Sequence, residues 1–346
     1  MRKAFPAIIG SVVWLTAASA TAGPEEFPRT ASGKPDFSGT YDIATLTPYM
    51  RRSEHGENMW LDPEAAAEVE AAAAARMEAA YQPSDPNRGP PAKGANVDAR
   101  SYDWFWMDPG TTMFKIDGKY RTSIIVDPPN GRIPAVSEAG KARRATLRRK
   151  GGWKNDGTAW WVETGDDPYD DPEGQSLQDR CLFLGVVTIP MRPVVYNNFK
   201  TIVQTEDHVM ILVEWMHWPR MVRMNEDHLP DDMRSMAGDS IGWWEGDTLV
   251  VDTTNFLAEP GLPRDGLRIE ERFSPLDANR LLYRFTVHDD DLVAPYTGEL
   301  PWPKSDKSLY EYACHEGNYS MGNTLRGARR LEKVWIEERA ETSEGE

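Results

Sequence analysis

The sequence predicts a mainly β protein: an antiparallel barrel or sandwich of lipocalin-like architecture, with a helical N-terminal arm and helical excursions on its surface. In the second half of the chain, short runs rich in β-branched and aromatic residues follow one another, as at 200–205, 208–215 and 248–254. Turn pairs such as Gly246-Asp247 separate these runs, which is the pattern of consecutive hairpins. Neither a strand–helix alternation nor a glycine-rich phosphate loop occurs, so a nucleotide-binding α/β fold is not expected. Several antiparallel strands at short intervals indicate a sandwich or a closed barrel.

The first 22 residues have the features of a signal peptide. Arg2 and Lys3 form a charged start, an apolar run extends to Ala18, and residues 20–22 read Ala-Thr-Ala, a small-residue cleavage pattern. No later stretch contains 18 uninterrupted apolar residues, so we expect no transmembrane segment in the mature chain. The sequence therefore predicts an exported protein, periplasmic if its source is a Gram-negative bacterium.

An N-terminal arm at 23–94 is predicted to precede a single β domain at 95–340. One short strand is expected at 34–43. A helix is expected over 62–81, because Asp-Pro-Glu at its start supplies a capping aspartate, a proline at the first helical position and an acidic first turn. The proline- and glycine-rich residues 82–94 then form a linker.

Within the β domain, the sequence predicts a hairpin around Asp117-Gly118, with its second strand at 120–126. Ser137 is expected to cap a short basic helix that ends near Lys150, and 151–176 to be a surface excursion. The remaining strands follow from the runs of β-forming residues and are expected at 200–205, 208–215, 241–245, 248–254, 268–273, 280–288 and 308–315.

The composition limits the classes of partner. The formal net charge is −16, and no run of basic residues is dense enough to override that field, so neither nucleic acid nor an anionic lipid surface is expected to bind. Hydrophobic residues make up 40% of the chain, which is enough for a sizeable core. The oligomeric state is left open.

Cys181 and Cys314 are the only two cysteines. Two cysteines in an exported protein most simply form one disulfide. The competing interpretation is a thiolate nucleophile at Cys314, which its neighbours His315 and Glu316 suggest. A nucleophile requires a free cysteine of low pKa, and an oxidising compartment disfavours it.

The segment VEWMHWPRM at 213–221 concentrates candidate catalytic groups, because Glu214, His217 and Arg220 recur every third residue. A buried glutamate beside a histidine and an arginine would suit general acid–base chemistry. The alternative is a structural ion pair between Glu214 and Arg220, with His217 at a strand end. A spacing of three on a strand need not place side chains on one face.

A metal site would have to draw on the six histidines of the chain. His208, His217 and His228 could assemble a three-histidine site across neighbouring strands. No H-x-H or H-E-x-x-H pair occurs, however, and the E-x-x-H pair formed by Glu214 with His217 is a metal motif of helices rather than strands. We therefore predict no metal and no other cofactor.

Two further features bear on ligands. The stretch GDSIG at 238–242 matches the composition of a nucleophile elbow but leads into a strand, so a serine hydrolase is not expected. Asp239 in this stretch is kept as an orienting carboxylate. Among the 13 tryptophans, Trp215 and Trp244 are candidates for stacking on a ligand, with core filling as the alternative.

Several longer stretches carry a resemblance, namely RTSIIVDPPNGRIP (121–134), PVVYNNFKTIVQT (193–205), GDSIGWWEGDTLVVDTTNF (238–256) and YEYACHEGNYSMGN (310–323). Together with GKPDFSGTYDIATLTP (33–48), they resemble a large family of exported bacterial proteins. The family has no established activity to transfer, so the resemblance implies a single exported domain and no particular reaction. Its members share cysteines at positions that match Cys181 and Cys314, which implies the same disulfide.

The resemblance extends to the candidate positions Tyr196, Asn197, Asn198, Glu214, His217, Arg220, His228 and Asp239. Two departures stand out. Residues 225–228 read Asn-Glu-Asp-His where the family has a D-G-R-P-H turn, and Ile241 replaces the arginine of a G-D-S-R-G stretch. If that arginine helps to hold an anionic ligand, this protein would prefer a different one.

Three functional hypotheses follow, of which the third is the weakest. The first is a cofactor-free lyase, isomerase or hydratase acting on a small apolar or aromatic molecule. Its proton-transfer groups would be Glu214, His217 and His315, oriented by Arg220 and Asp239, and its ligand contacts would be Tyr196, Asn197, Trp215, Trp244 and Glu316. The alternative is a periplasmic binding protein for a hydrophobic ligand, in which the same residues only fix orientation. A structural or envelope-interaction protein is a weaker option.

Overall fold

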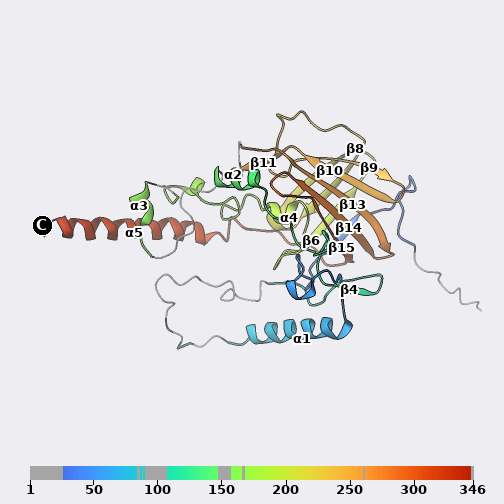
Figure 1. The fold of residues 1–346 in the computed structure, drawn as a ribbon, viewed down its shortest axis with the longest axis horizontal. Helices are drawn as coiled ribbons and strands as arrows, with labels where there is room; N and C mark the ends of the chain where they lie inside the picture. Colours follow the sequence, from blue (N-terminus) through green and yellow to red (C-terminus); the bar gives the residue numbers. More distant parts are fainter. Residues whose placement is uncertain are drawn as a thin grey trace, which may run out of the picture.

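The computed structural model describes residues 26–83, 86, 87, 89, 107–146, 157–165, 168–259 and 262–343. The predicted signal peptide lies outside these residues, as does most of the linker. Figure 1 shows a barrel with helix α1 (Pro63–Ala80) along one side and helix α5 (Tyr319–Ser343) projecting away from it. In the described part of the chain, none of the helices combines the length and the apolar composition needed to cross a membrane.

Nine strands close into a mixed barrel, in the order β1-β6-β7-β8-β9-β10-β13-β14-β15 and back to β1. The bounds are β1 Gly39–Asp42, β6 Phe199–Gln204, β7 His208–Val213, β8 Trp218–Met224, β9 Asp239–Glu245, β10 Thr248–Thr254, β13 Leu267–Asp277, β14 Arg280–Asp289 and β15 Tyr296–Ser305. Strands β1 and β15 close the ring, with Thr40 opposite Ser305. All neighbours in the ring are antiparallel except β8 and β9, which are parallel. The predicted mainly β barrel is thereby confirmed, and a sandwich is not formed.

A second group of elements covers one side of the barrel. The short strands β2 (Trp60–Leu61), β3 (Lys115–Ile116) and β4 (Lys119–Arg121) form a small sheet, and β5 (Ile125–Asp127) pairs with β15. The predicted hairpin at Asp117-Gly118 is confirmed, and both residues have the positive φ that its turn requires. The single strand predicted at 120–126 is instead split between β4 and β5.

The remaining elements are helical or short. The predicted helix at 62–81 is confirmed as α1, and Ser137 caps α2 (Glu138–Thr146) by accepting a hydrogen bond from the Gly140 amide at 3.0 Å. Short elements follow at α3 (Trp160–Thr164), α4 (Gly185–Thr188), β11 (Phe256–Glu259) and β12 (Leu262–Arg264), with 3-10 turns η1 (Ser53–His55), η4 (Pro172–Gly174) and η5 (Trp215–His217).

Three segments differ from the sequence prediction. The strand predicted at 308–315 is wrong: these residues form an irregular segment and a turn that lead into the unpredicted helix α5. The continuous strand assumed at 213–221 is broken by η5, where Met216 and His217 have positive φ. Strand β15 was not predicted, because Pro301 and Pro303 are residues that usually stay out of ladder positions.

The barrel interior is filled by large side chains. Fully buried residues on the neighbouring strands β13, β14, β15 and β1 include Phe273, Tyr283, Phe285, Trp302 and Tyr41. The Tyr283 ring lies 4.9 Å from that of Trp302 and 5.0 Å from that of Phe273, between centroids. Close packing of this kind makes the interior a core.

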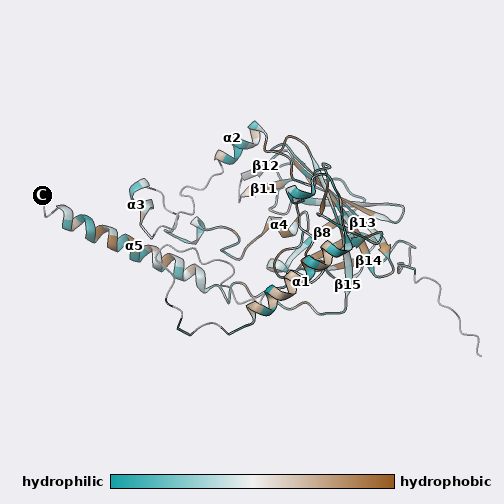
Figure 2. Ribbon diagram, turned by 60° about the horizontal axis from the view of Figure 1, so that its bottom comes forward, coloured by the Kyte–Doolittle hydropathy of each residue, from teal (hydrophilic) through white to brown (hydrophobic). Residues whose placement is uncertain are grey.

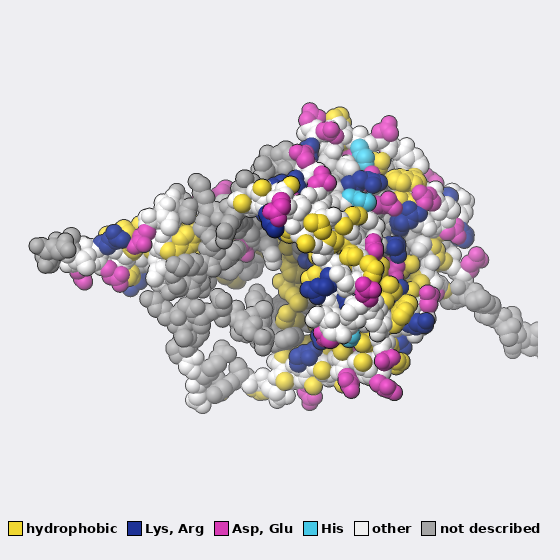
Figure 3. Space-filling model, viewed as in Figure 1, with side chains coloured by type: hydrophobic (Ala, Val, Ile, Leu, Met, Phe, Trp, Pro, Cys, Tyr) yellow, Lys and Arg dark blue, Asp and Glu magenta, His cyan; other side chains and the backbone are white. Residues whose placement is uncertain are grey.

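Outside the barrel, α5 alternates hydrophilic and hydrophobic bands along its length (Figure 2). Its apolar side chains Ala328, Leu331 and Trp335 belong to a small separate cluster with Trp161 of α3. Acidic and basic side chains are interspersed over the face of the barrel seen in Figure 3. The molecule thus has a main core in the barrel and a satellite core at α5.

Candidate functional site

A pocket of about 750 Å³ lies at one end of the barrel, where β13 begins and β14 ends. Several distant segments of the chain meet there, among them α2, the 173–180 turn, α4, the β11–β12 hairpin and the end of β14. We call it the barrel-end pocket. Its lining residues are Arg144, Glu173, Gly174, Gln175, Ser176, Leu177, Gln178, Arg180, Phe183, Leu184, Gly185, Ile189, Met236, Phe256, Leu257, Ala258, Arg264, Leu267, Asp289 and Asp291.

Apolar side chains form the inner part of this pocket. Ile189 and Phe256 are buried and belong to the barrel core, so the core itself supplies part of the floor. Phe183 is also buried, and its ring packs edge-on against Trp218. Leu257 and Leu267 extend the apolar surface toward the opening. A concave site with an apolar floor is the usual setting for a small organic ligand.

Ion pairs balance the charge of the rim. Arg264 pairs with Asp289 and, at 2.8 Å, with Asp291. Asp291 is only 3% exposed and also accepts a hydrogen bond from Arg143 Nε at 2.7 Å, which ties α2 to the end of β14. With three arginines and three carboxylates (Arg144, Arg180, Arg264, Glu173, Asp289 and Asp291), the described lining carries no net charge.

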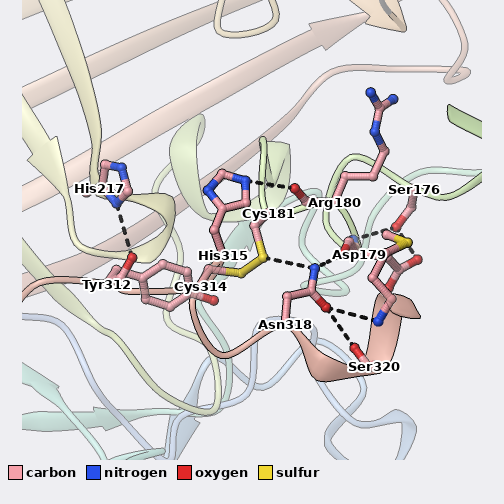
Figure 4. The surroundings of a disulfide bond; sticks show 11 residues. Ser176, Asp179, Arg180, Cys181, His217, Tyr312, Cys314, His315, Asn318 and Ser320 are labelled. Carbon is pink, nitrogen blue, oxygen red and sulfur yellow. Dashed lines mark hydrogen bonds between the residues drawn. A yellow bond between two sulfur atoms is a disulfide. The ribbon is translucent and has the colours of Figure 1, made fainter. Parts of the chain in front are cut away.

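The disulfide fixes the wall that contains residues 173–180. Cys181 and Cys314 are bonded, with their Cα atoms 5.7 Å apart, so the predicted disulfide is confirmed and neither sulfur is a free thiol. Beside it, the ring of His315 bonds the Arg180 carbonyl at 3.2 Å (Figure 4). The Asn318 amide donates to the Asp179 carbonyl at 2.7 Å. The segment around Cys314 therefore holds a wall of the barrel-end pocket in place.

The two histidines proposed for proton transfer lie on the surface. His217 is exposed and its Nδ1 lies 3.2 Å from the Tyr312 carbonyl oxygen; His315 is exposed on a turn, where no strand alternation directs it toward a cavity. Each of the two rings makes a hydrogen bond to a backbone carbonyl, as Figure 4 shows. Neither residue lines the barrel-end pocket.

Glu214 lies at the start of η5 and is 8% exposed, with its carboxylate accepting a hydrogen bond from the Phe199 amide at 3.0 Å. The cation near it is Lys200, a fully buried side chain opposite Tyr41 and Val213 in the barrel. Burial lowers the pKa of Lys200 from 10.5 to about 8, although Glu214 and Asp42 partly oppose that shift. The alternative interpretation, an ion pair between Glu214 and Arg220, is therefore wrong. The charged group near Glu214 is Lys200, and Arg220 pairs with Glu271.

We expect Lys200→Met to stabilise the protein at pH 7 by up to about 3 kcal/mol, because the wild type must bury an ammonium group whose pKa is lowered. A lowered lysine pKa means that the unfolded state binds more protons, so wild-type stability rises between about pH 8 and pH 10.5. The difference in free energy of unfolding between Lys200→Met and the wild type should therefore decrease as the pH rises from about 8 to 10.5. Urea unfolding from pH 7 to 10.5 measures it, with exposed Lys333→Met as control. A pH-independent difference would contradict the prediction.

Arg220 points into the barrel and is 3% exposed. Its guanidinium pairs with Glu271, with Nη1 3.0 Å from Oε1, and it also donates to Ser240 at 3.2 Å and to Thr253 at 3.0 Å. Tyr283 donates to the same Glu271 carboxylate at 2.6 Å. Each polar group has a partner inside a packed core, so Arg220 belongs to a structural network.

Asp239 lies in a different cluster, on the outer face of β9. It accepts hydrogen bonds from His228 Nδ1 at 2.8 Å, from the Leu229 amide at 3.0 Å and from Arg223 at 3.1 Å. Burial raises the pKa of Asp239, but the hydrogen bonds that it accepts outweigh that effect and hold the pKa below its ordinary value. The other nitrogen of His228 lies 3.1 Å from Asp252. Through these two contacts, His228 holds the loop that follows β8 against strands β9 and β10 of the barrel.

A three-histidine metal site would require the rings of His208, His217 and His228 to converge on one point, but each ring has different neighbours. His208 is exposed at the start of β7, His217 bonds a backbone carbonyl, and His228 lies between two carboxylates. Among the residues that the structure describes, no group of three or more histidine, cysteine, aspartate or glutamate side chains is arranged to hold a metal ion.

The proposed ligand-contacting residues lie away from the barrel-end pocket. Trp215 is 4% exposed and stacks on Tyr196, with ring centroids 4.3 Å apart. Asn197 occupies the turn beside them with a positive φ. Trp244 packs against Phe37 at the barrel core, and Glu316 is exposed. Trp215 and Trp244 therefore fill the core, which was the alternative interpretation of these tryptophans.

Sequence reasoning missed the residues that do line the pocket. Two signals were present: the acidic run 289–291, which supplies Asp289 and Asp291, and the apolar residues that follow Cys181. Neither of these two stretches indicates by itself which distant segment of the chain it contacts in the folded protein. Comparisons with family models, with curated proteins and with solved structures gave no match to this chain.

Proposed function

We propose that this protein binds a small, partly apolar molecule in the barrel-end pocket and performs no chemistry on it. One observation carries the proposal: an apolar floor continuous with the barrel core, surrounded by a rim whose ion pairs are already matched. A ligand in such a site gains from burial of its apolar surface, at about 25 cal/mol per Å². Because the ion pairs of the rim already neutralise one another, the ligand does not need to carry a charge.

Binding is favoured over catalysis by the position of the candidate acid–base groups. Glu214, His217, Arg220, Asp239 and His315 lie apart from the pocket, and Arg220 and Asp239 are engaged in hydrogen-bond networks of the fold. Proton transfer requires a group within hydrogen-bond reach of the bound molecule. Export to the periplasm, which the predicted signal peptide at 1–22 and the disulfide support, suits a carrier or receptor of small molecules.

A neutral fluorescent probe, N-phenyl-1-naphthylamine, tests the proposal. We expect saturable binding to one site, and at least tenfold weaker binding by Ala258→Trp, because an indole at this position occupies the pocket. The matched control is Ala72→Trp on the exposed face of α1, which should leave the dissociation constant unchanged. Circular dichroism checks that both variants are folded. Equal affinity of Ala258→Trp and the wild type would refute the pocket as the binding site.

A further inference from the structure

A second pocket, of about 440 Å³, lies at the base of α5. We call it the α5 pocket. It is formed by the first turns of α5 on one side and by α3 with the 169–179 segment on the other. Its described lining includes Trp161, Tyr169, Gln175, Asp179, Gly327 and Ala328.

Small residues on one face of α5 leave the space for this pocket. Thr324, Gly327 and Ala328 follow at helical spacing, so they share the face that looks toward α3. A Cβ atom placed on Gly327 would meet no heavy atom within 4 Å. The opposite wall is held by Trp161, whose ring packs edge-on against Tyr169 at 4.6 Å and whose Nε1 donates to Glu332 at 2.8 Å. The hollow therefore lies between two fixed surfaces.

The chemistry of the α5 pocket differs from that of the barrel-end pocket. Its described lining offers hydroxyl groups, two amides and one carboxylate, but no lysine or arginine. Such groups donate to and accept from ligand hydroxyls, whereas an anionic ligand would find no counter-charge. Trp161 and Tyr169 add aromatic surface for the C–H groups of a ring. This combination fits a neutral, hydroxyl-rich group such as a sugar.

The two pockets meet at Gln175, which is 8% exposed and lines both of them. Its side-chain amide donates to the Pro168 carbonyl, which fixes its position between the two spaces. The neighbouring turn divides in the same way: Asp179 lines the α5 pocket, and Gln178 and Arg180 line the barrel-end pocket. One bound molecule could therefore have an apolar part on one side of Gln175 and a polar part on the other.

We propose that the α5 pocket is a subsite for a neutral sugar, and that the ligand of this protein is an amphiphile with a sugar head and an apolar tail. This inference rests on the proposed function, because the tail would occupy the barrel-end pocket. The α5 pocket then selects among apolar molecules by their head group.

Octyl β-glucoside, used below its micelle concentration, is the probe for this inference, and isothermal titration calorimetry is the measurement. We expect it to bind more tightly than octanoate, which has an anionic head. Gly327→Leu should weaken glucoside binding at least tenfold, because Gly327 lines the α5 pocket and the space around an added Cβ atom is open, so the new side chain would occupy the pocket. It should leave naphthylamine binding unchanged. Lys333→Leu, at an exposed position of α5 that does not line the pocket, is the matched control and should stay within twofold of the wild type.

The outcomes separate the two proposals. If glucoside binding is insensitive to Gly327→Leu while naphthylamine still binds and responds to Ala258→Trp, the sugar subsite is refuted and the proposed function stands. Tighter binding of octanoate than of octyl glucoside also refutes the subsite. A third outcome is that naphthylamine does not bind, whereas methyl β-glucoside binds to the wild type and not to Gly327→Leu. This outcome would refute the barrel-end pocket as an apolar binding site and would support the sugar subsite.

Discussion

Arg220→Met is expected to destabilise the protein by about 3–5 kcal/mol, because it leaves the carboxylate of Glu271 inside the barrel without its counter-charge. Glu271 is fully buried, and the guanidinium of Arg220 supplies two of the hydrogen bonds to its oxygens. Tyr283 supplies another, but a phenol does not compensate a buried negative charge. Urea unfolding of the two proteins at pH 7 measures the difference.

A double-mutant cycle separates the ion pair from side-chain packing. Arg220→Met combined with Glu271→Leu removes both charges, so we expect much of the lost stability to return. Arg280→Met is the control, since its pair with Asp277 is partly exposed and should contribute less than about 1 kcal/mol. If the Arg220 single variant is as stable as the wild type, the network is not the structural element that we describe.

Replacing both disulfide cysteines with serine is expected to lower the free energy of unfolding by as much as about 5 kcal/mol, from the chain-entropy relation for a long closed loop. Cys181 and Cys314 are separated by 133 positions, so the bond removes many conformations from the unfolded chain. Because the bond also anchors the wall at 173–180, the variant should bind the naphthylamine probe more weakly.

Reduction of the wild type by dithiothreitol provides the check on this double variant. It should reproduce both effects without any change of sequence, whereas the reductant should leave the unfolding midpoint of the serine variant unchanged. A reduced wild type that keeps its midpoint and its affinity would show that the bond stabilises neither the fold nor the pocket wall.

Much of the secondary structure follows from local sequence patterns. Runs of β-forming residues predicted β6, β7, β10 and β14 close to their observed bounds, because a strand with one buried face requires a period of two. Asp117-Gly118 predicted its hairpin, since these residues tolerate the positive φ of the turn. The disulfide followed from the presence of two cysteines in a chain predicted to be exported.

Other elements are determined by tertiary contacts. Strand β15 contains two prolines and still belongs to the barrel, because β14 on one side and β1 with β5 on the other hold it in the sheet. The break at η5 places His217 on the surface, against the expectation of a continuous strand. Spacing along the chain could not reveal this break, because it depends on two residues with positive φ between β7 and β8.

The sequence by itself determined the β class, several of the hairpins, helix α1 and the disulfide, because periodicity, turn residues and cysteine count act over short distances or by simple pairing. Only the tertiary structure decided that the sheet closes with β1 against β15 and that α2, the 173–180 turn, β11 and the end of β14 surround one pocket. The physical reason is that these segments are distant in the chain. Their approach depends on closure of the barrel, which no local pattern records.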